Sequence, residues 1–264
     1  MRARILATSS ALAVLLAATT GAAGDERLVA SARGVLAKYK GALVTVRLTA
    51  KVRNVYQGRE QAGPEETSEI SGTMLLPSGL TVVSDMSGDP SGRGSPKSAN
   101  IETDITDTKL VLQDGRELAA HFVLRDRDLD LAFVMPEEQG LALPYVAFDG
   151  DATLQRLDDV IQIYLLGKMH SREVAVALGK VQAVLTKPRR LAAVDLVTGL
   201  RSLGCPAFNA AGQVVGLVVM KRAPEQAGSY GGLRDMLDLM QPVIMPAETI
   251  RELAAQATAK PPTP

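Results

Sequence analysis

The sequence predicts a mostly-β protein with a short helix near each end, and two patterns support this fold class. Apolar residues alternate with polar ones in several short runs, beginning with residues 44–52, as expected for strands with one buried face. Helical spacing of apolar residues is limited to residues 25–41 and to the segment after Pro246. Many short strands with little helix between them favour antiparallel sandwiches or barrels over alternating strands and helices.

The composition is that of an ordinary globular protein, and it narrows the function classes. Of the 264 residues, 46% are hydrophobic and 22% are charged. The 29 basic and 29 acidic residues balance, which argues against nucleic acid as a main partner because phosphate binding needs an excess of positive charge. A single Cys excludes an internal disulfide framework and a Cys-rich zinc site, and the two His residues are far apart in the sequence. We therefore expect neither a metal site nor a cofactor.

The first 23 residues have the pattern of a secretory signal peptide. Arg2 and Arg4 form a basic start, Ile5–Ala18 is uncharged and rich in Leu and Ala, and small residues precede a cleavage site after Ala23. The uncharged stretch is too short to span a bilayer of about 30 Å as a helix. An uncleaved anchor and a frayed N-terminal helix are the alternatives. We expect a periplasmic or secreted protein with no stable membrane span.

The first half of the mature chain divides into one helix followed by strands and loops. Changes in periodicity and composition define these segments: a helix over 25–41, a half-buried strand over 44–52, a polar loop over Gly58–Glu69, two short strands within 70–85 joined at Pro77-Ser78-Gly79, a surface loop over Ser87–Asn100, and the strands Lys109–Gln113 and Arg116–Leu124. The last two strands flank Asp114-Gly115, and Asp-Gly between two such runs is a strong β-hairpin signal.

The second half of the chain shows the same pattern of short strands and turns. Short strands separated by turn residues are expected at Val160–Leu166, Val174–Leu178, Val181–Leu185, Leu191–Leu196 and Gln213–Met220. Pro246 then stands at the expected first position of a helix that carries Ile250, Leu253 and Ala254 on one face. The tail Lys260–Pro264 is expected to fray.

Five segments, taken in order, resemble the trypsin-like serine proteases of the HtrA/Do type. They are Ser71-Gly72 with Pro77-Ser78-Gly79-Leu80; Gln113–Glu117 with Arg125-Asp126 and Asp130-Leu131-Ala132; Gly167, Gly179 and Val181; Asp195 and Pro206–Asn209 with Gly212–Gly216; and Met245–Ile250. The resemblance covers about residues 70–250. The chain stops where that family's PDZ domain normally begins, so we expect a degenerate member without this module.

This resemblance implies two six-stranded antiparallel β-barrels of the chymotrypsin type, with short helices at the two ends and a site in the cleft between the barrels. In this sequence the first barrel would span about 42–150 and the second about 155–245. A C-terminal helix and tail would occupy 246–264.

The resemblance also aligns three residues with the family's catalytic triad, and only one of them is the residue type that the family has there. Met86 falls where the family has His, Asp130 where it has Asp, and Leu203 where it has the nucleophilic Ser. Leu203 has no nucleophilic atom, and the Met86 thioether cannot accept a proton near neutral pH. Losing either group costs on the order of a million-fold in related hydrolases. Arg201 replaces a Gly in the turn that forms the oxyanion hole with the amide at position 203, so we expect that hole to be lost as well.

Other residues could in principle replace the missing groups. Ser202 and Cys205 are alternative nucleophiles, and His121 and His170 are alternative bases or ligands. We interpret Ser202 as a polar turn residue, Cys205 as a small hydrophobic residue, and both His as surface residues. Asp130 is expected to persist as a hydrogen-bonded structural carboxylate. The acidic residues Glu102, Asp104 and Asp107 match no metal-binding loop and are interpreted as a solvated face.

These residues are compatible with two main function classes and with a third, weaker one. The favoured hypothesis is a catalytically inactive homologue of HtrA/Do-like endopeptidases that binds peptide or protein segments in the cleft between the barrels. The alternative is an active serine endopeptidase with a non-standard or misaligned site. A structural domain of an envelope assembly is the third possibility. A homo-oligomer is compatible with each of them.

Overall fold

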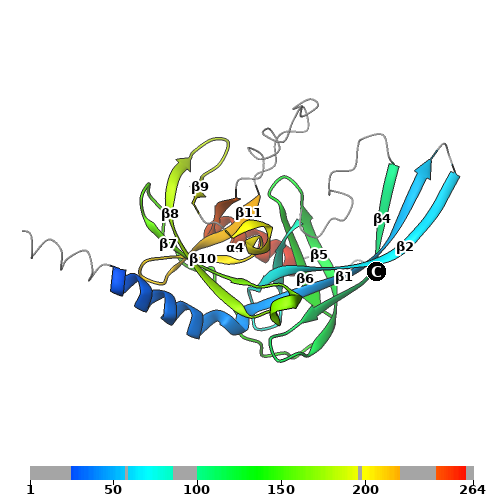
Figure 1. Cartoon of the computed structure of the whole chain (residues 1–264), viewed down its shortest axis with the longest axis horizontal. Coiled ribbons are helices and arrows are strands. Elements are labelled where there is room, and N and C mark those ends of the chain that lie inside the picture. Colours follow the sequence, from blue (N-terminus) through cyan, green and yellow to red (C-terminus); the bar gives the residue numbers. More distant parts are fainter. Residues whose placement is uncertain (1–24, 57–58, 86–99, 196–197, 221–241, 260–264) are drawn as a thin grey trace, which may run out of the picture.

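The computed structural model describes residues 25–56, 59–85, 100–195, 198–220 and 242–259 (Figure 1). The predicted signal peptide, residue Met86 and nearly all of the predicted loop Ser87–Asn100 lie outside these residues. None of the described helices is long and apolar enough to cross a membrane.

The described strands form two closed antiparallel barrels of six strands each, which confirms the fold class expected from the sequence. Barrel one has the strand order β1-β2-β3-β6-β5-β4, and barrel two has the order β10-β11-β12-β9-β8-β7. The strands of barrel one are β1 Leu43–Tyr56, β2 Arg59–Met74, β3 Thr81–Ser84, β4 Asn100–Val111, β5 Glu117–Asp126 and β6 Leu131–Pro136. The strands of barrel two are β7 Asp159–Leu165, β8 Val174–Leu185, β9 Leu191–Val194, β10 Pro206–Asn209, β11 Val214–Met220 and β12 Pro242–Pro246.

Three clusters of buried apolar side chains hold this architecture together. One cluster, with Val44 and Leu110, belongs to barrel one, and a second, with Val160 and Val218, belongs to barrel two. The third cluster joins residues of both barrels to the two terminal helices. Since apolar burial is the main stabilising contribution to folding, this shared cluster makes the barrels and helices one packed unit.

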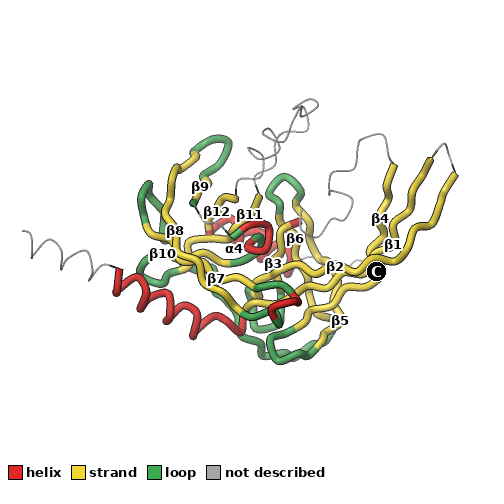
Figure 2. Tube along the Cα trace, viewed as in Figure 1, coloured by secondary structure: helices red, strands yellow, loops and turns green. Residues whose placement is uncertain are grey.

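The two helices pack on the barrels through one face each (Figure 2). The N-terminal helix, residues 25–39, buries Val35, and Tyr39 at its end stacks on Phe208 of β10 with 5.1 Å between ring centroids. The C-terminal helix α4, Ala247–Ala259, buries Ile250 and Leu253. The positions of both helices agree with the sequence prediction, except that Pro246 ends β12 and α4 begins one residue later.

The predicted polar loop Gly58–Glu69 is wrong, because residues from Arg59 onward belong to β2. β2 pairs with β1 as far out as Tyr56, and β4 pairs with β1 from the other side. In Figure 1 these strands extend well beyond the barrel as a three-stranded arm. The pairing register shifts at Gly63-Pro64, where a proline without an amide hydrogen is tolerated. Residues 59–67 show no alternation of apolar and polar residues, so their sequence resembles a loop.

Further differences concern individual strands. The predicted strands Val174–Leu178 and Val181–Leu185 are one strand, β8, which pairs with β7 up to Lys180 and with β9 from Val181 onward. β4 begins at Asn100 and not at Lys109, and the sequence prediction does not include β6. It also does not include the short strands β10 and β12. Each has five residues or fewer and contains proline, so neither shows the alternation that a strand prediction depends on.

Candidate functional site at the junction of the barrels

Asp130 lies buried at the start of β6 and links the two barrels. Its side chain is at the end of a turn in which the Leu129 amide donates to the Asp126 carboxylate. The residue is 1% exposed and has a φ of 57°, a left-handed conformation that is rare for a residue other than glycine. Oδ2 accepts hydrogen bonds from the Ser84 hydroxyl at 2.7 Å and from the Met220 amide at 2.9 Å. Ser84 belongs to barrel one and Met220 to barrel two, so one carboxylate oxygen bridges them.

A second buried carboxylate lies directly after β3. Asp85 is fully buried and accepts a hydrogen bond from Nε of Arg125 at 2.7 Å. Its amide donates to the Asp130 carbonyl at 3.1 Å. A buried charge is tolerated only when it is paired in this way. The chain is therefore held in a defined position up to the residue that precedes Met86.

Leu203 follows the short helix η4, Gly199–Ser202, and points into the core of barrel two. It is 1% exposed and belongs to the same apolar cluster as Val160 and Val218. A buried leucine side chain offers no atom that could attack a carbonyl carbon. The residue that the resemblance aligns with the nucleophilic Ser is thus part of the hydrophobic core.

Gly204 packs closely against two neighbouring strands of barrel one, β2 and β3. Its φ is 77°, and a Cβ added to it would lie 2.7 Å from the Ser71 carbonyl oxygen and 3.1 Å from the Ser84 nitrogen. The Thr73 hydroxyl donates to the Gly204 carbonyl at 2.7 Å. Only glycine fits such a close approach in this conformation. Because both Gly204 and Asp130 contact Ser84, the structure brings the segment of Leu203 and the carboxylate of Asp130 to one junction.

The two alternative nucleophiles are buried. Ser202 and Cys205 are both fully buried, and the Ser202 carbonyl accepts a hydrogen bond from Nε2 of Gln162. Burial raises the pKa of the Cys205 thiol to about 12, although bonds from Leu165 and Ser71 act in the opposite direction. A thiol with this pKa is almost entirely protonated near neutral pH, and the thiol form is a poor nucleophile.

The remaining candidate residues lie at the surface or at its edge. His170 is exposed in η3, Lys168–His170, and His121 on β5 is half-buried opposite Met135. Asp104 and Asp107 are exposed on β4, and Asp107 approaches Lys109 at 3.8 Å. Among the described residues, no group of three or more His, Cys, Asp or Glu side chains could hold a metal ion.

Arg201 is exposed and lies against the loop that connects β7 to β8. A Cβ added at Gly167 would lie only 2.1 Å from Nη1 of Arg201, so the guanidinium group rests directly on the glycine backbone. A long cationic side chain therefore occupies the part of the junction where the resemblance implies a glycine of the oxyanion hole.

Comparison with known protein families shows which family the chain belongs to. Residues 82–217 match the trypsin-like peptidase domain, which is just over half of the chain and reaches from β3 in barrel one to β11 in barrel two. The chain belongs to the trypsin-like peptidase domain family. No curated protein matches it.

In this trypsin-like domain, the junction contains polar groups that sequence reasoning missed. Ser84, the Met220 amide, Thr73 and Gln162 all make buried hydrogen bonds there. For Ser84 a signal was present, because it lies two residues before Met86, which the resemblance aligns with a triad residue. The other three come from distant segments, and only the packed barrels place them near Asp130 and Leu203.

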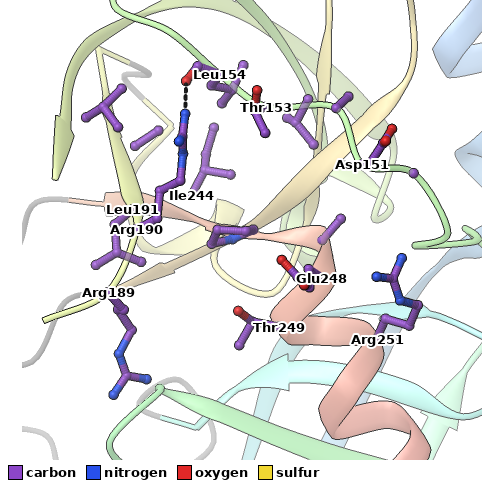
Figure 3. A pocket seen from close by; sticks show the side chains of 17 residues that line it. Asp151, Thr153, Leu154, Arg189, Arg190, Leu191, Ile244, Glu248, Thr249 and Arg251 are labelled. Atoms are coloured by element: carbon purple, nitrogen blue, oxygen red, sulfur yellow. Dashed lines mark hydrogen bonds between the residues drawn. The ribbon is translucent and has the colours of Figure 1, made fainter. Parts of the chain in front are cut away.

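A separate cavity of about 370 Å³ opens on barrel two, away from these groups (Figure 3). Its apolar lining includes Leu154 and Ile244 of the barrel-two core. Arg190 donates to the Leu154 carbonyl at 2.9 Å. Asp151 lies on the segment between β6 and β7, and Glu248 lies on α4. Side chains of both charge signs line the cavity, so its electrostatics select neither an anionic nor a cationic ligand.

Proposed function

We propose that the protein is an exported, non-catalytic member of its family, of the HtrA/Do type, that binds extended peptide or protein segments at the junction of its barrels. The observation that carries the proposal is Leu203, which is 1% exposed in the barrel-two core at the position aligned with the nucleophile. Acyl transfer by this family's route needs a hydroxyl nucleophile beside a base, and a buried leucine cannot supply one.

The surroundings of Leu203 support this interpretation. Ser202 and Cys205 have no solvent-exposed surface, so neither can reach a substrate without unfolding of the segment. Asp130 uses Oδ2 to hold Ser84 and Met220 together, which is a structural task. The sequence has Met86 at the position that the resemblance aligns with the family's histidine, and a thioether cannot act as the base of a triad.

Binding without catalysis is chemically reasonable for this fold. Sheet edges hold an extended peptide as an added strand through main-chain hydrogen bonds, and those bonds require no triad. The junction keeps a defined backbone, because Gly204 and Thr73 connect the segment after Leu203 to barrel one. Arg201 adds an exposed cation beside this segment. Export would place the protein in the periplasm or outside the cell, where unfolded segments of other proteins are available partners.

The absence of catalysis is tested with a fluorophosphonate probe, which labels activated serine hydroxyls covalently. We expect no labelling of the purified protein, with trypsin under the same conditions as the positive control. The variant Leu203→Ser should also remain unlabelled, because position 86 still lacks a base. Labelling of any serine in the unmodified protein would contradict the proposal and support the active serine endopeptidase.

Peptide binding is tested by fluorescence anisotropy with a library of labelled, unstructured peptides. We expect saturable binding that Arg201→Glu weakens about ten-fold, which corresponds to about 1.4 kcal/mol. Arg189→Glu is the matched control, since it changes another exposed arginine, on the turn between β8 and β9. Flat anisotropy across the library, or equal effects of the two substitutions, would contradict binding at the junction.

A further inference from the structure

The loop between β7 and β8, residues 166–173, has a defined conformation although it lies at the surface. The Leu166 amide donates to the Glu173 carbonyl at 2.9 Å, which closes the base of the loop, and the His170 amide donates to the Gly167 carbonyl at 2.8 Å. Ser171 and Arg172 both have a positive φ, 53° and 54°. A non-glycine residue in this region costs about 1–2 kcal/mol, so contacts elsewhere must hold the loop in this shape.

Arg172 connects this loop of barrel two to barrel one. Its Nη2 donates to Oε1 of Glu69 at 2.6 Å and its Nε donates to Oε2 at 3.1 Å, a two-pronged arrangement in which both carboxylate oxygens are used. Glu69 lies on β2, 103 residues away in the sequence. The side chains of Glu69 and Arg172 are only 23% and 24% exposed, which reduces their screening by water.

Barrel one holds Glu69 in place for this contact. Nε of Arg47 on β1 approaches Oε1 of Glu69 at 3.4 Å, and the same guanidinium group donates to Glu117 on β5. Lys109 on β4 lies 3.8 Å from Glu117. Among the described residues, the charges that face Glu69 are thus Arg172 and Arg47 directly, with Glu117 and Lys109 behind Arg47. The hydrogen bond from Arg172 is the largest cause that holds the pKa of Glu69 below its usual value.

The other end of the loop rests on Arg201. Gly167 begins η3 and lies so close to the Arg201 guanidinium group that a Cβ there would meet Nη1 at 2.1 Å. One short loop therefore contacts Glu69 of barrel one through Arg172 and Arg201 of the junction through Gly167. A group that fixes one end of a short, internally bonded loop restricts the other end as well.

We propose that Glu69 is a positioning residue that latches the 166–173 loop of barrel two onto barrel one and thereby holds Arg201 at the junction, and that neutralising Glu69 releases the loop. The latch concerns the junction discussed above but does not rest on peptide binding there. It gives the protein a means of changing the shape of this junction by charge. Acidification or a cationic partner that competes for Glu69 would open it.

The test is hydrogen–deuterium exchange of the purified protein, followed by mass spectrometry of peptides that cover residues 166–173. In Glu69→Gln we expect these amides to exchange at least about ten-fold faster than in the unmodified protein, which corresponds to about 1.4 kcal/mol. Glu117→Gln is the matched control, because it also removes a carboxylate bonded to Arg47 but leaves the Arg172–Glu69 pair intact. In Glu117→Gln, the amides of residues 166–173 should exchange at the same rate as in the unmodified protein.

Two outcomes would overturn the proposal: unchanged exchange of the loop in Glu69→Gln, or equal acceleration in both variants. Arg172→Gln removes the same pair from the loop side, so its loop should exchange as fast as in Glu69→Gln, and the double variant should add nothing further. This non-additivity distinguishes the latch from general destabilisation. If Glu69→Gln does not fold, exchange of the unmodified protein at about 1 M salt serves instead, because screening weakens the pair. None of these measurements involves a peptide, so a failed latch and a failed binding proposal are distinguishable.

Discussion

At the scale of single residues, Asp130 keeps a buried carboxylate but gives it structural partners. In a proton relay the carboxylate orients an imidazole. Here Oδ2 accepts one hydroxyl from Ser84 and one backbone amide from Met220. These two buried hydrogen bonds help to hold a residue with a φ of 57° at this position. The described hydrogen bonds of the Asp130 side chain therefore connect the two barrels to each other.

Cys205 should be unreactive in the folded protein. Burial raises the pKa of its thiol to about 12, so at about pH 8 only about one molecule in 10⁴ carries the thiolate, against roughly a quarter in the unfolded chain. We expect a chromogenic disulfide reagent to react at least about 10³-fold more slowly with native protein than with protein in guanidinium chloride. Reaction of the native protein at a rate close to that of the unfolded chain would show that the segment 201–205 opens.

At the scale of elements, the segment 201–206 is defined by what it packs against. It leaves η4, buries Leu203 in barrel two, and then brings Gly204 against β2 and β3 of barrel one. The Val218 carbonyl accepts the Gly204 amide at 2.8 Å, so the same residue is bonded to β11. One short segment thereby connects both barrels, and its shape depends on a glycine.

Replacing that glycine should be far more harmful than replacing a glycine in open space. Gly204→Ala adds a Cβ that meets a backbone oxygen at 2.7 Å, in addition to the cost of a positive φ. Gly115→Ala is the control, since Gly115 has a φ of 86° but no atom within 4 Å of an added Cβ. Urea unfolding should show a loss of about 1 kcal/mol for Gly115→Ala and more than about 3 kcal/mol for Gly204→Ala. Similar losses of stability in the two variants would mean that Gly204 does not pack closely against the Ser71 carbonyl.

Strands with one buried face could be predicted from sequence, and those without one could not. Residues 44–52 alternate because Val44, Val46 and Leu48 enter the barrel-one core. The outer part of β2 shows no alternation of apolar and polar residues, so its sequence resembles a loop, although in the structure it pairs with β1. β10 and β12 are too short to show a period, and their neighbours in the closed barrel define them.

At the scale of the whole molecule, two barrels and two helices share one apolar cluster, and polar contacts add to it at the junction. Asp130, Gly204 and the Glu69–Arg172 pair each connect one barrel to the other. The first two are buried and contain no exposed charge, whereas the Glu69–Arg172 pair is partly exposed and depends on ionisation. A fall in pH through the lowered pKa of Glu69, or a rise in salt, should therefore alter the loop 166–173 well before it separates the barrels.

The sequence by itself determined the mostly-β class, the two terminal helices and, through its resemblance to the trypsin-like proteases, the double barrel. The same resemblance named Asp130 and Leu203, because the spacing of turn residues and glycines along the chain aligns them with the family's triad. Only the tertiary structure decided where those side chains point: Leu203 into a core, Asp130 toward the Met220 amide 90 residues away, and Arg172 toward Glu69. The physical reason is that such contacts join segments whose separation leaves no periodic signal, and barrel closure alone brings them within bonding distance.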